Sequence, residues 1–467
     1  MRHHGHCVRR GSGRLQDRAG AARLSLYDTA LGLLPLRRTV RIGVTGLARS
    51  GKTTLLTSLA ANLLATGARL PALPALMQRL GGRALRVAIA PAGASGIPRF
   101  DYAGKLAALD ADPPGWPAPT EAVSLLALDL DIGRDGLLAT LPPQRLRLEL
   151  LDYPGEWLLD IPMLGLDFAA WSRATLARLD HPLADGFGAF VAGLPAAAPA
   201  DEGLARTGHE LFRALLLRLR DEARLPFLQP GRFLMPPPGP EPPWMAFFPL
   251  PDAGGPLGDL LRRRYDAYRL HVRAELVAPS FGSVEQLVVL ADVLGALHAG
   301  AVPFAQMREA LGAVAGALRW RGDDWLRWLL SFAAGIRRVA FVATKADHVA
   351  ERQRGNLGRL VRDLAATPAV RAEAFAIAAV RCTQDIVWTL EGRPVSAVRG
   401  RILGDERPVR SYPGEVPDRL PDAEFWTHPF LALPEFEPMR LDLGGRAGVP
   451  HIGVDALTAW LLEDVLP

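Results

Sequence analysis

Hydrophobic residues recur with two different periods along the chain. Residues 39–45 (TVRIGVT) form an apolar, β-branched run that ends in a glycine turn, which predicts a buried strand, and residues 52–66 carry the apolar stripe of a helix. After a proline- and glycine-rich stretch that runs to Trp116, residues 124–132 and 145–153 alternate apolar and polar side chains. We expect these two segments to be half-buried strands joined as a hairpin.

Helical spacing dominates the middle of the chain, and strand patterns return after it. From Glu156 to about Gly282, leucine, alanine and arginine recur at helical spacing, except in the proline-rich residues 229–244. Three further strand patterns follow, at residues 286–294, 337–347 and 373–381. Because helical segments separate them, we expect parallel strands with crossover connections. The chain therefore reads as an α/β fold with a mostly parallel sheet and a large helical insertion.

A glycine-rich turn joins the first strand to the first helix. Residues 46–53 (GLARSGKT) match the P-loop pattern in the strand–turn–helix context that it requires. Gly46 and Gly51 let backbone N–H groups turn toward phosphates. Lys52 would reach the β- and γ-phosphates and Thr53 would ligate Mg²⁺; the alternative is an ordinary glycine-rich turn. The residues expected to bind phosphate are Gly46, Ala48, Arg49, Ser50, Gly51, Lys52, Thr53 and Thr54.

An acidic residue ends the strand in LELLDYPGEW (residues 148–157). If this strand lies beside the P-loop strand, Asp152 can hold the magnesium water shell and the Gly155 N–H can face a γ-phosphate. Aspartate and glycine are also common turn residues, so only the position after a core strand makes this DxxG segment informative.

A TKxD segment indicates which nucleotide base the protein binds. In FVATKADHV (residues 341–349), Asp347 would accept hydrogen bonds from guanine N1–H and its exocyclic amine, which adenine does not offer. Lys345 would lie along the base and the P-loop. Thr344 stands where asparagine is commoner, so one hydrogen bond that tethers the loop is expected to be weaker. The alternative is a strand-end turn with a capping aspartate.

Lysine usage supports both motifs. The chain has only three lysines, Lys52, Lys105 and Lys345. All other side chains counted as positively charged at pH 7 are arginines. A position that keeps lysine in such a chain is one where a compact ammonium is needed. Two of the three lie in the P-loop and TKxD segments.

These motifs, in this order, form the skeleton of the Ras-like GTPase fold, which suggests further site residues. Thr120, before the second strand, either completes Mg²⁺ coordination or caps a turn. Glu156 stands where many relatives of the fold place a water-orienting glutamine; it can act as general base, but its charge repels the γ-phosphate, so we expect slow hydrolysis. Arg49 either supplies charge to the transition state or points to solvent. A backbone N–H at Ala379 or Val380 is expected to meet the guanine oxygen.

The wording of several segments is more specific. TGLARSGKT, LLDYPGEWLLDIPML, ATKADHV, YPGEVP and PHIGVDALTAWLL resemble the YcjX-like family of bacterial stress-associated P-loop proteins from about residue 22 onward. The resemblance implies a Ras-like domain with a large helical insertion, guanine-nucleotide binding, and a link to envelope or phage-shock-type stress. It also implies a protein partner at the inner membrane.

The expected organisation has a nucleotide-binding domain interrupted by the insertion. We expect a flexible tail (1–21), the first part of the domain (22–155), the helical insertion (156–283) and the second part (284–467), with a proline- and glycine-rich second insertion at 386–447. A closing amphipathic helix is expected within GVDALTAWLLEDVL.

Composition narrows the remaining alternatives. At 467 residues, with 49% hydrophobic and 22% charged residues, the chain is long enough for two or more globular units. It has no apolar run of about 18 residues and no secretory signal pattern, and its two cysteines fit a reducing cytosol. We therefore expect a cytoplasmic protein, which would be peripheral at the inner membrane if a partner holds it there. Scattered histidines predict no zinc site. The net charge of +5 fits solvated helix faces or an anionic surface, and we predict no specific nucleic-acid partner.

Three functions remain open at this stage. The first is a Mg²⁺-dependent GTPase switch whose insertion reports the nucleotide state. The second is an ATP-using ATPase or kinase, against which Asp347 argues. The third is a nucleotide-binding module that does not hydrolyse its ligand and stabilises an assembly.

Overall fold

A computed structural model describes most of the chain. The described residues are 38–47, 49–91, 96–118, 122–136, 139–236, 239–251, 254–277, 284–317, 336–365, 371–405, 407–428 and 433–466. The expected tail and two expected site residues, Ala48 and Thr120, lie outside them.

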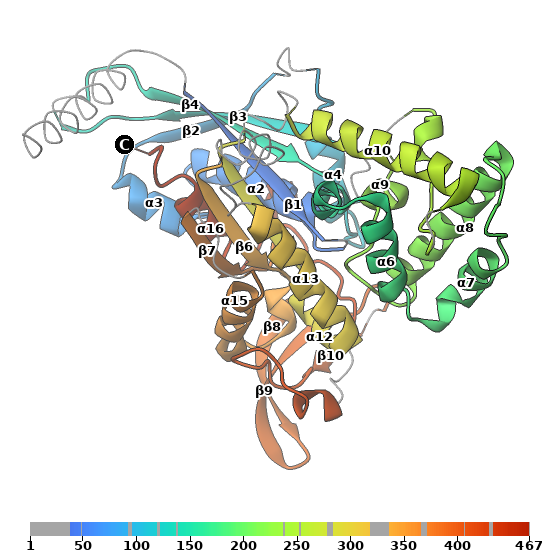
Figure 1. Cartoon of the computed structure of the whole chain (residues 1–467). Coiled ribbons are helices and arrows are strands. Elements are labelled where there is room, and N and C mark those ends of the chain that lie inside the picture. Colours follow the sequence, from blue (N-terminus) through green and yellow to red (C-terminus); the bar gives the residue numbers. More distant parts are fainter. Residues whose placement is uncertain are drawn as a thin grey trace, which may run out of the picture.

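A seven-stranded sheet forms the centre of the described structure (Figure 1). Its strands are β1 (Arg38–Gly46), β2 (Leu85–Ile89), β3 (Ser124–Ile132), β4 (Gln144–Asp152), β5 (Gln286–Ala291), β6 (Arg338–Ala343) and β7 (Arg371–Ala376), in the order β2–β3–β4–β1–β5–β6–β7. Strands β4, β1, β5, β6 and β7 are parallel, whereas β2, β3 and β4 pair antiparallel. The predicted hairpin of residues 124–132 and 145–153 and the predicted parallel strands are therefore confirmed.

Alternation along the buried strands divides the core into two layers. In β5, Val288 and Leu290 pack with α2 (Lys52–Gly67), α3 (Pro74–Leu80) and α16 (Val454–Leu461) on one face of the sheet. Leu287 and Val289 pack on the opposite face with α13 (Ala301–Ala317) and α15 (Glu351–Ala365). Because successive side chains of a strand point to opposite faces, an all-apolar strand needs helices on both sides. The result is a three-layer α/β/α arrangement.

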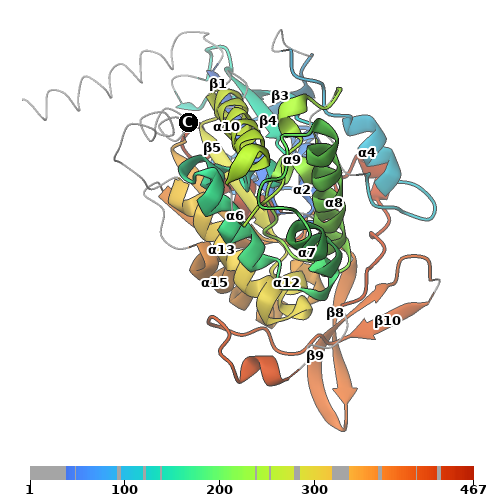
Figure 2. The same ribbon diagram turned by 45° about the vertical axis from the view of Figure 1, so that its right-hand side comes forward.

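The helical segment predicted from residue 156 onward is present. It contains α5 (Gly155–Leu158), α6 (Phe168–Arg178), α7 (Asp185–Ala192), α8 (Glu202–Asp221), α9 (Gly231–Leu234) and α10 (Gly255–Val277). In Figure 2 α6, α7, α8 and α10 come forward over one end of the sheet. Aromatic side chains fill its interior: Trp171, for example, stacks on Tyr265 with ring centroids 5.1 Å apart. This core merges with the one on the α13 face of the sheet.

Some boundaries differ from those expected, and two stretches without a predicted element contain several. The strands expected at 337–347 and 373–381 end earlier, at Ala343 and Ala376. The stretch before Trp116 contains β2, α3 and α4 (Tyr102–Leu109). The strand expected at 286–294 stops at Ala291, since Asp292 caps the next helix, α12 (Val293–Ala299), by accepting from Gly295 N–H at 2.9 Å.

The second insertion carries its own sheet. Strands β8 (Thr383–Leu390), β9 (Arg393–Arg401) and β10 (Pro408–Ser411) pair antiparallel apart from the main sheet, and the β8–β9 hairpin projects from the molecule (Figure 1). The closing helix is shorter than expected, because α16 covers only Val454–Leu461.

Candidate functional site

The motifs meet at one edge of the sheet. Parallel strands end at the same edge, and β1, β4, β5 and β6 are parallel neighbours. The P-loop follows β1, Asp152 ends β4, Asp292 follows β5 and the TKxD loop follows β6. The register confirms this for β1 and β4, where Asp152 is the Cα partner of Val44. Sites in such sheets lie outside the carboxyl ends of the strands.

The P-loop has the shape of a phosphate cradle. Gly51, which directly precedes α2, adopts the left-handed conformation (φ 81°), and its carbonyl oxygen accepts from the Leu55 N–H at 2.9 Å. The start of a helix is the positive end of the helix dipole, so this turn suits an anion in front of α2. Lys52 Nζ donates to the carbonyl oxygen of Gly46 at 3.1 Å, which holds the ammonium over the loop.

The segment after β4 packs directly on the P-loop. A Cβ placed on Gly155 would lie 1.5 Å from the carbonyl oxygen of Gly46, so only glycine fits there. Glu156 follows at the start of α5; its side chain is buried. Glu156 Oε2 and Ser50 Oγ are two of several buried side-chain atoms that have no hydrogen-bond partner within the described residues. Their place beside the P-loop suits a polar ligand there.

The helical segment clamps the other side of this loop. A Cβ on Gly231 would lie 1.7 Å from the carbonyl oxygen of Glu156. Trp157 Nε1 donates to Met235 O at 2.8 Å, and the guanidinium of Arg232 lies 4.7 Å from the centre of the Trp157 ring. The segment from Gly155 onward is thus held between the P-loop and α9.

A buried ion pair extends this clamp. The Asp160 carboxylate accepts from Arg232 Nη1 at 2.8 Å, from Gly231 N–H at 2.6 Å and from Tyr268 Oη at 2.6 Å, and both charged side chains are fully buried. Arg232 also pairs with Glu275. Sequence reasoning missed these residues, because Asp160 lies some 70 residues from Arg232 and no spacing rule joins them.

Arg49 is drawn toward the helical segment. It adopts the left-handed conformation (φ 60°), and its Nη2 lies 3.3 Å from Asp221 Oδ1, at the end of α8. The neighbouring Arg220 binds the same carboxylate, with Nε 3.0 Å from Oδ1 and Nη2 2.8 Å from Oδ2. These two arginines hold the pKa of the Asp221 carboxyl below its usual range, chiefly through the hydrogen bond from Arg220.

The loop after β6 forms the other end of the site. Lys345 adopts the left-handed conformation (φ 58°), and its Nζ donates to Asp292 Oδ2 at 2.5 Å. Burial raises the pKa of Asp292, but the Lys345 ammonium and the Gly295 N–H outweigh it and keep that pKa low. Thr344 ties β6 to β5, since its N–H donates to Ala291 O at 3.0 Å. Asp292 is the partner that sequence reasoning did not find.

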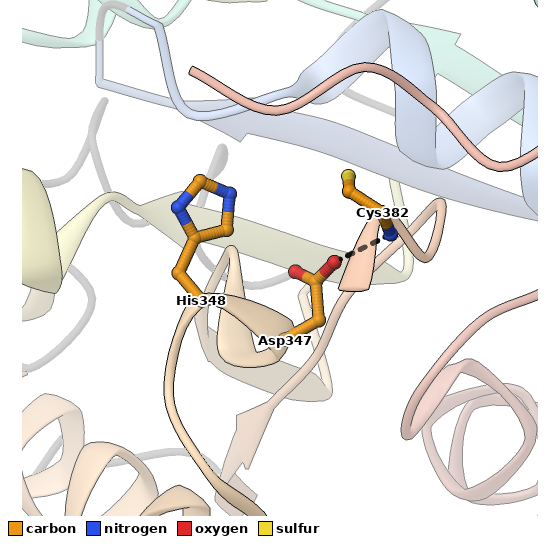
Figure 3. A group of neighbouring side chains, drawn as sticks. All are labelled: Asp347, His348 and Cys382. Atoms are coloured by element: carbon orange, nitrogen blue, oxygen red, sulfur yellow. Dashed lines mark hydrogen bonds between the residues drawn. The ribbon is translucent and has the colours of Figure 1, made fainter. Parts of the chain in front are cut away.

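Asp347 lies buried beside the segment that follows β7 (Figure 3). Its Oδ2 accepts from the Cys382 N–H at 2.7 Å. Burial lowers the pKa of His348 and raises that of the Cys382 thiol. The N–H groups of Ala378 and Arg381 donate to Ile452 O and Pro450 O, whereas those of Ala379 and Val380 bond to no backbone carbonyl of the described residues.

This arrangement defines the class. The strand order, the P-loop between β1 and α2, and the loops that end β4 and β6 are those of a P-loop NTPase with the Ras-like fold. Comparison with known proteins agrees: the chain belongs to the YcjX-like family, DUF463, which matches residues 40–466.

Two curated relatives cover nearly the whole chain. It is 34% identical over 455 residues to a protein of Escherichia coli (strain K12) named Ras-like GTPase YcjX, which covers 92% of this chain and 96% of the relative. It is 32% identical over 463 residues to the protein of the same name from Shewanella oneidensis, with 92% and 95% covered. In the part of the chain that the structure describes, no helix combines the length and apolarity needed to cross a membrane.

Proposed function

We propose that this protein is a Mg²⁺-dependent guanine-nucleotide-binding protein and a slow GTPase. The observation that carries the proposal is the convergence of three loops, which follow β1, β4 and β6, at one edge of the parallel sheet. The relatives named Ras-like GTPase support it. Since neighbouring strands lie about 4.8 Å apart, the three strand steps from β4 to β6 span roughly 14 Å, which suits one extended nucleotide.

The phosphate end fits an anion and a magnesium ion. Lys52 and the N–H groups at the start of α2 would bind the phosphates, while Thr53 and Asp152 would hold Mg²⁺, with Thr120 as the third expected ligand. The fit rests on the buried Ser50 Oγ and the close approach of Gly155 to Gly46. When bound, Mg²⁺ neutralises charge on the β- and γ-phosphates.

The base end fits guanine. The Asp347 carboxylate is fixed by one N–H bond, and its remaining lone pairs would accept from the guanine N1–H and amine. The N–H groups of Ala379 and Val380 are the expected donors to the guanine oxygen. Adenine would leave a buried carboxylate unpaired, so ATP is expected to bind weakly.

Slow turnover follows from the residues near the γ-phosphate position. Glu156 is a buried carboxylate that would act as general base and would also repel the γ-phosphate. Arg49, drawn to Asp221 at 3.3 Å, would have to turn back toward the phosphates to stabilise the transition state. Replacement Glu156→Gln removes the negative charge, so we expect the affinity ratio of GTP to GDP to rise by about tenfold.

The helical insertion is the proposed output. Gly155 contacts the P-loop and the same short segment contacts α9, so movement of Gly155 with the γ-phosphate would shift the insertion. Identical protease cleavage at residues 156–170 with GDP and with a non-hydrolysable GTP analogue would exclude this coupling. The cytoplasmic location, the stress link and the inner-membrane partner are proposed from the family resemblance.

Nucleotide affinity tests the proposal most simply. GDP, GTP and ATP are titrated with and without Mg²⁺ into the unaltered protein and Asp347→Ala, with the exposed Asp363→Ala as matched control. We expect tight, Mg²⁺-dependent binding of guanine nucleotides that only Asp347→Ala weakens. Equal affinity for ATP would favour an ATP-using enzyme, and binding without turnover above the buffer rate would favour an assembly module.

A further inference from the structure

Three potential metal ligands lie together at the base end of the site. Asp347 and His348 belong to the 3₁₀ turn Ala346–His348, and Cys382 follows β7. The carboxylate oxygen, the ring nitrogen and Sγ all lie within 4.8 Å of one another. Figure 3 shows the imidazole and the thiol on either side of the Asp347 carboxylate. We call these residues the Asp–His–Cys cluster.

The surroundings orient these ligands. The Cys382 N–H donates to Asp347 Oδ2 at 2.7 Å, which fixes the carboxylate. The Phe436 ring packs edge-on against the His348 imidazole, with ring centroids 5.1 Å apart. Outer contacts of this kind hold ligands in place around a metal. Asp347 and Cys382 are buried and His348 is half-buried, so His348 is the most accessible of the three ligands.

The donor set favours zinc over magnesium. Zinc accepts thiolate, imidazole and carboxylate ligands at about 2.0–2.3 Å, which places the ligand atoms roughly 3.5 Å apart. The cluster reaches this spacing with shifts of about 1 Å. Magnesium prefers oxygen ligands and has no use for the sulfur. The neighbouring cation Lys345 is paired with Asp292 at 2.5 Å, which offsets its repulsion of a metal ion.

We propose that the Asp–His–Cys cluster binds one Zn²⁺ ion, and that this ion and the guanine base exclude each other at Asp347. Binding forms Zn–S, Zn–N and Zn–O bonds, releases the Cys382 thiol proton to solvent and leaves a water molecule as fourth ligand. The zinc site stands on the cluster alone; the competition rests on the proposed function. Histidine spacing in the sequence predicted no zinc site. It could not indicate this cluster, because only the fold brings Cys382 next to Asp347 and His348.

The experiment must first remove other side chains that could bind zinc. The N-terminal sequence MRHHGHC also carries histidines and a cysteine, so the reference protein is the full chain with H3A, H4A, H6A and C7S. Zinc is titrated into it without nucleotide against a chromogenic chelator, and Co²⁺ is used to detect a thiolate ligand by its charge-transfer absorption. Cys382→Ser and His348→Gln are added separately, with exposed His298→Gln as control.

We expect one equivalent of zinc, a thiolate–cobalt band, and a loss of zinc affinity of at least about tenfold in each cluster variant but not in the control. Zinc should also raise the apparent Kd of GDP in proportion to its free concentration, and Cys382→Ser should abolish that effect. A zinc affinity that is unchanged in both cluster variants would overturn the proposal. GDP binding that is tight but indifferent to bound zinc would overturn the competition, whereas no GDP binding without zinc would refute the proposed function and leave the zinc site standing.

Discussion

Removal of the Arg232 charge tests how firmly the helical insertion holds the loop after Gly155. In Arg232→Met the Asp160 carboxylate keeps the donors Gly231 N–H and Tyr268 Oη but loses its counter-charge in a fully buried position. Breaking a buried ion pair by removing one partner costs about 3–5 kcal/mol. We therefore expect the free energy of unfolding to fall by that amount.

The matched control is an exposed ion pair. Arg218 and Glu222 are four residues apart on and just after α8, with about half of each side chain exposed. Because solvent screens exposed pairs, Arg218→Met should leave the unfolding free energy nearly unchanged. Urea unfolding is followed by tryptophan fluorescence, since Trp157 and Trp171 lie in this region.

A double-mutant cycle isolates the pair. Asp160→Leu alone should also destabilise, because Arg232 would then be left buried with only Glu275 as its acid partner. The double variant Asp160→Leu/Arg232→Met should be more stable than the sum of the two single changes predicts, by about 2 kcal/mol or more. If Arg232→Met costs less than about 1 kcal/mol, or if the two single effects add, the buried pair does not stabilise this region as described.

Two other changes test separate parts of the structure. Gly231→Ala should destabilise by at least about 2 kcal/mol, because its Cβ would lie 1.7 Å from Glu156 O, whereas Gly186→Ala, where a Cβ meets nothing within 4 Å, should be neutral or stabilising in thermal unfolding. Burial lowers the pKa of His209 from 6.5, so the unfolded chain binds more protons below that pH. The unfolding free energy should fall by up to about 1.4 kcal/mol per pH unit on acidification from pH 6.5, and His209→Gln, unlike His298→Gln, should flatten this slope.

Patterns within short stretches of sequence predicted the P-loop with its flanking strand and helix, and the buried parallel strands. The β-branched run of β1, the glycine at its end and the apolar stripe of α2 are written in consecutive residues, so the P-loop and its context were found. The strands β5, β6 and β7 were found because buried parallel strands are continuously apolar.

Features that depend on tertiary contacts were not predictable. Strand β2 is only five residues long, too short for its sequence pattern to indicate a strand. It is recognised only by its pairing with β3 in the structure. Strand β8 exposes half of its side chains, and its pattern is too polar to stand out. The Asp292–Lys345 and Asp160–Arg232 pairs and the Asp–His–Cys cluster join residues far apart in sequence, and one sequence holds no record of such proximity.

The affinity of Asp347→Asn for xanthine and guanine nucleotides shows whether Asp347 recognises the base. Xanthine carries a carbonyl oxygen where guanine carries its amine, and the asparagine amide donates where the Asp347 carboxylate accepts. We predict that this variant loses about 100-fold or more in GDP affinity and gains affinity for xanthosine diphosphate, whereas the exposed Asp363→Asn leaves both affinities unchanged. GDP affinity that is the same in Asp347→Asn and in the unaltered protein would contradict this prediction.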